Sequence, residues 1–279
     1  MLEQNPWMPF LDDAPVALER AAIGLLAAIV ISLVAKRAES LSASGALAAI
    51  LVGAASAAAG WAFGSLLIIY FLAATTISRF RRADKVRLAG SVVSKGDTRD
   101  ATQVLANGGV YAASALLTLV GSSHFGTAMT LAALGALAAS LADTWATEIG
   151  ILFGGTPRSL LSLRPVPPGT SGGVSVAGLL AMIAGSTLIA LLGAALGLSS
   201  TVFIVTAAGI AGTLTDSLLG ATLQERRWCP VCRRASERRV HVCGTATSLS
   251  GGHEWMDNDL VNLIATAAGA AVAALLATL

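Results

Sequence analysis

The sequence has 279 residues, of which 55% are hydrophobic and only 12% are charged. Its mean hydropathy of +0.74 lies well above that of ordinary soluble domains, which excludes a soluble enzyme or binding module. The net charge of +2 says nothing about nucleic acid, because membrane topology accounts for the basic residues, and no nucleic-acid partner is expected. The composition therefore predicts a polytopic membrane protein embedded in a lipid bilayer.

Apolar segments recur along the whole chain. A helical crossing needs about 20 apolar residues, and long alanine, leucine and glycine runs without strict alternation exclude a β-barrel. We predict an all-α helical bundle forming a single integral membrane domain over residues 1–279. Its eight transmembrane helices are expected at 17–35, 42–59, 61–78, 102–121, 127–152, 174–197, 201–222 and 259–278. The joints at 60–61 and 198–200 are short, so tilted or half-inserted hairpins are the alternative there.

Lysine and arginine predict the orientation of these spans. The loops after spans one, three, five and seven hold 17 of the 18 basic residues, and Arg20 is the exception. By the positive-inside rule this face is cytoplasmic and both termini lie outside. Residues 1–15 lack a basic segment followed by a cleavage site, so no signal peptide is predicted. We therefore expect a protein of the cytoplasmic membrane.

The first polar motif, residues 94–109, leads into the fourth span. Asp100, Gln103 and Asn107 are spaced i, i+3, i+7 and form one stripe on a helix. The residues before the stripe are charged, and they are Lys95, Asp97 and Arg99. An N-capped helix with a solvated first turn is an equally good interpretation of Asp100. Because Gln103 and Asn107 continue deeper into the membrane, we favour a site.

The second motif places carboxylates inside the fifth span. Asp143 and Glu148 lie with Thr144 and Thr147 in the apolar stretch 131–153. A charged side chain at the membrane centre costs at least about 2.5–3.5 kcal/mol, so such residues usually mark a functional site. Oxygen ligands on one helix face suit Mg²⁺, which binds carboxylates together with phosphates and water. A structural salt bridge is the alternative, disfavoured because the spans contain almost no basic residues.

The third motif is a glycine-rich loop that leads into the sixth span. Glycine permits close backbone approach, and a helix N-terminus presents free N–H groups to a phosphate. Arg164, before the loop, would add a bidentate contact. The loop is not a Walker A sequence, because no Gly-Lys-Ser/Thr follows. The candidate phosphate-binding residues are Gly169, Thr170, Ser171, Gly172 and Gly173.

Two further polar clusters adjoin the last spans. Asp216 and Gln224 rise along one face of the seventh span, and an Asp among small residues in a span favours a buried polar site. Asn258 and Asn262 share a face at the start of the eighth span. Asp259 lies beside them at the water boundary, where a simple helix cap explains it equally well.

The insert 225–254 between these clusters carries cysteine and histidine. Cys229, Cys232, His241 and Cys243 have the composition of a Cys₃His zinc site. A disulfide is disfavoured on the cytoplasmic side. We predict a structural Zn²⁺; the alternatives are His253 as a substitute ligand and lone reduced cysteines.

Residues 94–109, 142–150, 163–175, 215–224 and 258–262 together resemble the motifs of the transmembrane protein 19 family, an integral membrane domain of unknown function. The resemblance spans nearly the whole chain. The family includes a chloroplast phytyl-phosphate kinase, which converts an isoprenyl monophosphate to the diphosphate with a nucleoside triphosphate. Residues 143–150 are also similar to the Asp-x-x-Ala-x-x-x-Gly element of membrane CTP-using enzymes.

The resemblance implies an isoprenyl-monophosphate kinase. Mg²⁺ would be held by Asp143 and Asp216, helped by Glu148 or Asp100, and would bridge the nucleotide phosphates. The groups expected to neutralise the transferred phosphoryl group are Lys95, Arg99, Arg164 and the 169–173 amides. Such chemistry needs mainly positioning and charge stabilisation. Asp97 or Asp100 would orient the acceptor oxygen, and the isoprenyl tail would lie between small-residue helices or in lipid.

Two other functions remain open at this point. A cytidylyltransferase would use the same metal and nucleotide but would leave a nucleotide on the lipid phosphate. A transporter would need polar residues that reach the outer face and often an inverted repeat, and neither is evident. The sequence does not fix the isoprenyl chain length, the preferred nucleotide, the pathway, or the oligomeric state, a homodimer included. The insert is interpreted as a lid, a dimer contact or a stabiliser.

Overall fold

A computed structural model of the chain describes residues 8–90, 92 and 98–278. The helices of these residues are α1 (Met8–Arg37), α2 (Ala43–Ala59), α3 (Trp61–Arg79), α4 (Arg82–Ala89), α5 (Ala101–Leu117), α6 (Ser123–Phe153), α7 (Val176–Ala195), α8 (Val202–Thr222) and α9 (Asn258–Leu276). The strands are β1 (Arg158–Ser159), β2 (Gly173–Val174), β3 (Arg226–Cys229), β4 (Arg234–Ser236) and β5 (Ser248–Gly251). All strand pairings are antiparallel, between β1 and β2 and in the order β4-β3-β5.

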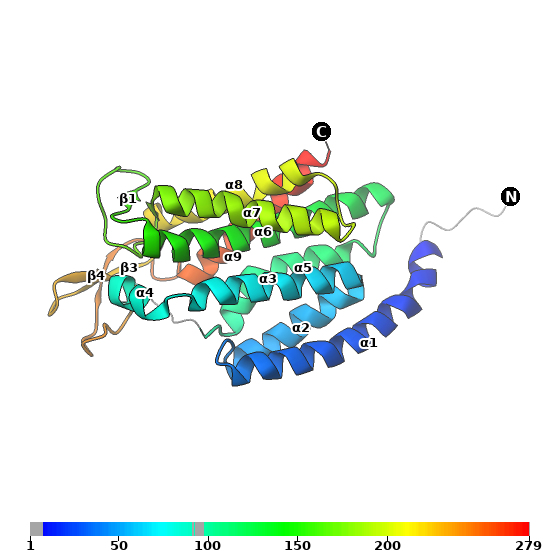
Figure 1. Cartoon of the computed structure of the whole chain (residues 1–279), viewed down its shortest axis with the longest axis horizontal. Helices are drawn as coiled ribbons and strands as arrows, with labels where there is room; N and C mark the ends of the chain where they lie inside the picture. The colour runs from blue at the N-terminus through cyan, green and yellow to red at the C-terminus, as the bar shows by residue number, and fades with distance from the viewer. Residues whose placement is uncertain (1–7, 91, 93–97, 279) are drawn as a thin grey trace.

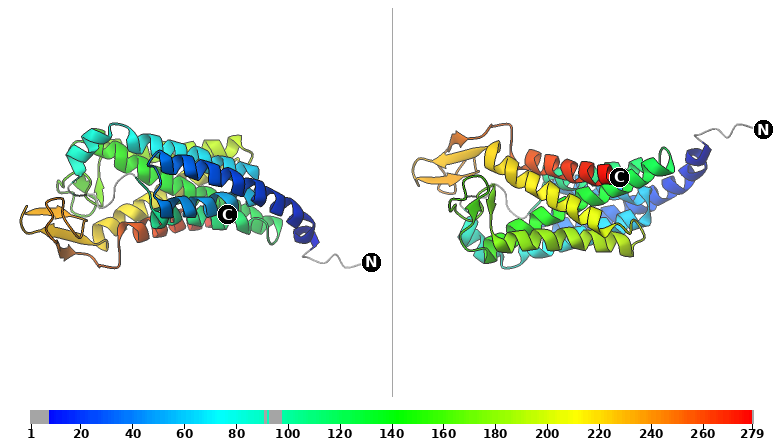
Figure 2. Two further views of the ribbon diagram at one scale, coloured as in Figure 1. Left: turned by 90° about the horizontal axis from the view of Figure 1, so that it is seen from below. Right: turned by 90° about the horizontal axis from the view of Figure 1, so that it is seen from above.

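The long helices form an up-and-down bundle with α4 and the strands gathered at one end (Figure 1). We call this the basic end, defined by segments 38–42, 80–90, 98–100, 154–175 and 223–257. Helices α1, α3, α6 and α8 finish there, and α2, α5, α7 and α9 begin there. The two views of Figure 2 show the same separation between the strand-bearing end and the opposite end. The predicted alternation of loops is therefore confirmed.

Each predicted span contains one of these helices, and the protein is a polytopic helical membrane protein. In the part of the chain that the structure describes, six helices are long and apolar enough to cross a bilayer: α1 from Pro15, α3, α6, α7, α8 and α9. Helix α2 is apolar but has 17 residues, and α5 also has 17. Seventeen residues rise about 25 Å, slightly less than the hydrocarbon thickness of about 30 Å. The eight predicted spans therefore correspond to eight helices, of which α2 and α5 are the shortest, whereas α4 was not predicted as a helix.

Helix α6 is the central element of the bundle. It packs against α3, α4, α5, α7, α8 and α9, and every residue from Leu131 to Ala142 is buried. Small side chains allow this close packing. A Cβ atom on Gly135 would lie 2.4 Å from the carbonyl oxygen of Gly269 in α9. Glycine is thus required where α6 and α9 touch, and this contact fixes how the two helices present their polar ends.

The segment between α8 and α9 forms a small sheet that is tied to the ends of both helices. The Glu225 amide donates to the Met256 carbonyl at 2.9 Å, and the His253 amide donates to the Leu223 carbonyl at 3.0 Å. Arg227 is 9% exposed and forms an ion pair with Glu225 at 2.5 Å. These contacts hold the insert against the basic end of the bundle.

Candidate active site

A cavity of about 480 Å³ opens at the basic end of the bundle. Its walls come from α3 to α9, from the segment between α6 and α7, and from the insert. Most of the motifs identified in the sequence meet here. The predicted site residues that line the cavity are Arg99, Gln103, Asn107, Asp143, Thr144, Glu148, Gly169, Thr170, Ser171, Gly172, Gly173, Asp216, Asn258 and Asn262. We call this the polar cavity.

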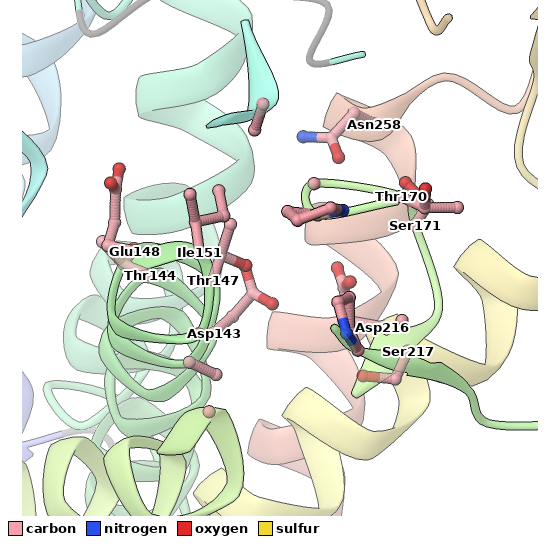
Figure 3. Close-up of a pocket in the computed structure, with 18 of the residues that line it drawn as sticks. Asp143, Thr144, Thr147, Glu148, Ile151, Thr170, Ser171, Asp216, Ser217 and Asn258 are labelled. Atoms are coloured by element: carbon pink, nitrogen blue, oxygen red, sulfur yellow. The ribbon is translucent and has the colours of Figure 1, made fainter. Parts of the chain in front are cut away.

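Two carboxylates from different helices project into the polar cavity. Asp143 on α6 and Asp216 on α8 extend toward the space between these helices (Figure 3). The Oδ2 atom of Asp216 is buried and has no hydrogen-bond partner within the described residues. A buried carboxylate oxygen without a partner is costly unless a cation or donor satisfies it. The pair therefore fits a hard, oxygen-preferring cation such as Mg²⁺.

The glycine-rich loop forms the wall beside Asp216. Gly172 has φ +73°, and a Cβ on it would lie 2.5 Å from the Cβ of Ala221 in α8. Both observations require glycine. The loop continues into α7, where the Ser175 hydroxyl caps the helix by accepting from the Gly178 amide at 3.2 Å. The predicted neighbourhood of loop, helix N-terminus and carboxylates is present in the fold.

The basic residues of the polar cavity differ in part from those predicted. Arg99 lines it, whereas Arg164 is exposed and lies outside its lining. Lys95 and Asp97 lie outside the described residues. Three further basic side chains line the cavity, although we used them only to predict the membrane topology: Arg82, Lys85 and Arg238.

Glu148 has a different role from the one expected. It forms an ion pair with Lys85 of α4 at 2.5 Å, and its side chain points away from the gap between Asp143 and Asp216 (Figure 3). Lys85 Nζ also donates to the Ile77 carbonyl at 2.9 Å. The argument that no basic residue is available to pair with Glu148 was therefore wrong, because α4 folds back over the end of α6 and supplies one.

We expect Lys85→Met to destabilise the protein strongly. The side chains of Lys85 and Glu148 are only 8% and 19% exposed, so losing the lysine removes an ion pair from a mostly buried carboxylate, at a cost of about 3 kcal/mol. Thermal unfolding in detergent measures the change. Lys36→Met, at the exposed end of α1, is the matched control. Adding Glu148→Gln to Lys85→Met should restore part of the loss; equal Tm values for Lys85→Met and wild type would contradict the assignment.

The polar residues at the start of α5 have two different roles: one caps the helix, and two line the polar cavity. Asp100 is the N-cap of α5 and forms a capping box with Gln103, so the cap interpretation is correct and Asp100 does not line the polar cavity. Gln103 and Asn107 do line it. Asn107 Nδ2 donates to the Gln103 carbonyl at 2.8 Å, and its Oδ1 accepts from Ser140 at 2.9 Å. The side-chain amides of Gln103 and Asn107 are therefore held in place near the start of α5, where this helix enters the membrane.

The polar residues of α9 also separate into two groups. Asn258 and Asn262 line the polar cavity. Asp259 is not the helix cap, because Asp257 caps α9; Asp259 instead accepts from Thr102 of α5 at 2.6 Å. Gln224 is buried behind the wall, 3.5 Å from the Asn258 side chain, rather than lining the cavity. Asp259 and Gln224 thus connect elements that carry the site.

Glu237 also lines the polar cavity, although it was not among the predicted site residues. It lies in the insert, accepts a hydrogen bond from Ser171 and acts electrostatically on Asp216. Burial raises its pKa to about 7, against the opposing effect of the Ser171 hydrogen bonds. The only local signal was a lone acidic residue among the arginines of 226–239. The insert therefore contributes to the polar cavity directly.

The four predicted zinc ligands converge in the insert. The ligand atoms of Cys229, Cys232, His241 and Cys243 all lie within 4.8 Å of one another. The Cys243 Sγ atom is 3.7 Å from Cys229 Sγ and 3.1 Å from His241 Nδ1, and all three cysteines are free. Three sulfurs and one imidazole fit a tetrahedral Zn²⁺. The ring of His253 instead stacks on Trp255, 5.6 Å away.

We expect about one Zn²⁺ per chain after purification without chelator. His241→Ala removes one of four ligands and should lower the zinc content and the Tm, because a structural site contributes folding energy. His253→Ala, which deletes a histidine of the same insert outside the cluster, should retain the metal. Elemental analysis of both variants measures this. Zinc loss in His253→Ala alone would favour the alternative ligand set.

Comparison with known proteins places the chain in a family. The model of an integral membrane protein family, DUF92, matches residues 26–270. Protein PGR of Arabidopsis thaliana is 31% identical over 86% of this chain and 91% of its own length. An uncharacterized membrane protein of Synechocystis is 30% identical over 78% of this chain and 74% of its own length. The chloroplastic protein VTE6 of Arabidopsis thaliana is 28% identical over 85% of this chain and 65% of its own length. No solved structure matches. The chain therefore belongs to the DUF92 family of integral membrane proteins.

Proposed function

We propose that this protein is an isoprenyl-monophosphate kinase of the cytoplasmic membrane. It would transfer a phosphoryl group from a nucleoside triphosphate to a membrane-embedded isoprenyl phosphate and form the diphosphate. The observation that carries the proposal is the pair Asp143 and Asp216, which face the polar cavity beside the 169–173 loop. The motif resemblance to a family that includes a chloroplast phytyl-phosphate kinase supports the same reaction.

The reaction follows from what these residues can do. An oxygen of the acceptor phosphate attacks the terminal phosphorus of the nucleotide, the bond from that phosphorus to the bridging oxygen breaks, and the nucleoside diphosphate leaves. Asp143 and Asp216 would hold Mg²⁺, which neutralises phosphate charge when bound. Arg99 and the loop amides would stabilise the transferred group. The acceptor phosphate is already ionised, so no general base is required.

The location of the polar cavity supports an active face on the cytoplasmic side. It opens at the basic end of the bundle, where 17 of the 18 basic residues of the sequence belong by topology. Nucleotides are available in the cytoplasm, and the lipid phosphate would reach the same level from within the bilayer. In the described residues the cavity lining consists of segments of this end and of the adjoining parts of the helices, which disfavours a transport path.

A phosphotransfer assay on detergent-purified protein tests the proposal. Phytyl or geranylgeranyl monophosphate is offered with labelled CTP or ATP and Mg²⁺, and the lipid products are separated. The isoprenyl diphosphate is the expected product. A nucleotide attached to the lipid would identify a cytidylyltransferase instead, and the absence of any lipid product with both nucleotides would overturn the kinase.

A further inference from the structure

A second cavity, of about 170 Å³, opens between α1 and α3, with α2 and α5 contributing the remaining walls. Helices α1 and α3 each pack against α2, and they lie along one side of the bundle (Figure 1). The walls are largely built from small and apolar residues. Representative members are Ala27, Ala49, Gly53, Gly64, Ile68 and Phe71. We call this the apolar groove.

The apolar groove and the polar cavity share one end. Arg99, Gln103 and Asn107 line both. A hydrogen-bonded chain also joins them, because Tyr70 of the groove contacts the Ser140 hydroxyl at 2.7 Å and Ser140 donates to Asn107 at 2.9 Å. A molecule lying in the groove would therefore present its head group to the polar cavity.

Arg99 stands at this junction, and among residues 8–90, 92 and 98–278 it has hydroxyl and aromatic neighbours. Its guanidinium donates to the Thr75 hydroxyl at 3.0 Å and to the Ser78 hydroxyl at 3.5 Å, and it lies 5.8 Å from the Phe71 ring centroid. Within the described residues no carboxylate pairs with it. An arginine held by hydroxyls and an aromatic ring, free of a carboxylate, is well suited to a phosphate.

The length of the apolar groove indicates what chain it can hold. Residues of α3 from Trp61 to Phe71 line it, which corresponds to about 15 Å along the helix, or about half of the hydrocarbon thickness. Gly64 lies near the end remote from Arg99, and small residues on α1 and α2 keep the space open. A lining of this length and composition fits a hydrocarbon chain that enters the membrane from one face.

We propose that the apolar groove binds the isoprenyl chain of the substrate, with the substrate phosphate at Arg99, Gln103 and Asn107. This inference rests on the proposed kinase function, because it assigns the lipid to the acceptor side of the same reaction. The phosphate would then face Asp143 and Asp216 across the polar cavity. The remote end of the groove, near Gly64 and Trp61, would set the preference for chain length.

Shortening the groove tests this assignment. Gly64 is the fourth residue of α3, and a Cβ there makes only ordinary contact with Ala57, 3.5 Å away. Gly64→Leu should therefore fold and fill the remote end. We expect kcat/KM for phytyl monophosphate to fall about tenfold relative to that for geranyl monophosphate, since the longer chain loses its buried methylenes. Gly126→Leu is the matched control: Gly126 is the fourth residue of α6, a Cβ there makes only ordinary contact with the Thr118 carbonyl oxygen, 3.6 Å away, and Gly126 lines neither cavity.

A binding measurement tests the groove assignment independently of the proposed kinase reaction. An isoprenyl monophosphate with a photoreactive diazirine in its tail should label peptides of α1 to α3, and Gly64→Leu should reduce that labelling. If labelling occurs there but no diphosphate forms, the proposed kinase function is contradicted and the assignment of the groove to the isoprenyl chain is supported. If the diphosphate forms but labelling lies elsewhere, or Gly64→Leu affects both chain lengths equally, the groove assignment is overturned.

Discussion

Asp143→Asn should abolish phosphotransfer without unfolding the protein. Asp143 faces Asp216 across the polar cavity, and an amide binds a divalent cation much more weakly than a carboxylate does. We expect kcat to fall at least about 100-fold, the size of effect seen when one charge-stabilising group is removed. Turnover of phytyl monophosphate with saturating Mg²⁺ and nucleotide measures the change.

The same variant should be at least as stable as the wild type when Mg²⁺ is absent. Two facing carboxylates repel each other in a low-dielectric site, which lowers the stability of the metal-free protein. Both are kept because metal binding requires them, so removing one charge should raise that stability. Thermal unfolding with and without Mg²⁺ is the measurement, and the stabilisation by Mg²⁺ should be smaller in Asp143→Asn. Asp84→Asn on α4, an aspartate that lies outside the polar cavity, is the control. Full activity in Asp143→Asn would refute the metal assignment.

Gly172→Ala is expected to reduce activity about 100-fold, because a displacement of about 1 Å near reacting groups has effects of this size. The added methyl group would lie 2.5 Å from the Cβ and 2.6 Å from the amide nitrogen of Ala221. The loop must therefore move away from α8. Since the loop and Asp216 line the same cavity, this movement separates the groups proposed to bind phosphate and metal. Steady-state kinetics with nucleotide varied measures the effect.

Gly155→Ala provides the matched control for this prediction. Gly155 belongs to the same connecting segment and also has a positive φ, +63°, but a Cβ there meets nothing within 4 Å. Both variants bear the backbone strain of a left-handed residue, about 1–2 kcal/mol, whereas only Gly172→Ala collides with α8. Activity close to wild type is expected for Gly155→Ala. Equal losses in the two variants would show that strain, rather than the position of the loop, is responsible.

The membrane bundle and its topology could be predicted from the sequence because both depend on local quantities. Runs of apolar residues specify spans through the hydrophobic effect, and the distribution of lysine and arginine specifies which loops share a side. Asp143 and Asp216 stood out for the same reason, since an ionisable residue in an apolar run is expensive wherever the helix packs. Cys229, Cys232, His241 and Cys243 likewise had the composition of a Cys₃His site within one short insert, which predicted their convergence, and the structure brings them together.

The tertiary structure decided which polar residues share a site. Glu148 binds Lys85 because α4 returns over α6, and Asp100 caps α5 outside the polar cavity. Glu237 reaches Ser171 through a sheet between two helices. Such contacts depend on helix rotation and on close approaches such as that of Gly135 and Gly269, and no local pattern encodes them. By itself the sequence determined a multi-span membrane protein with carboxylates at one face; packing determined their partners and the groove beside them.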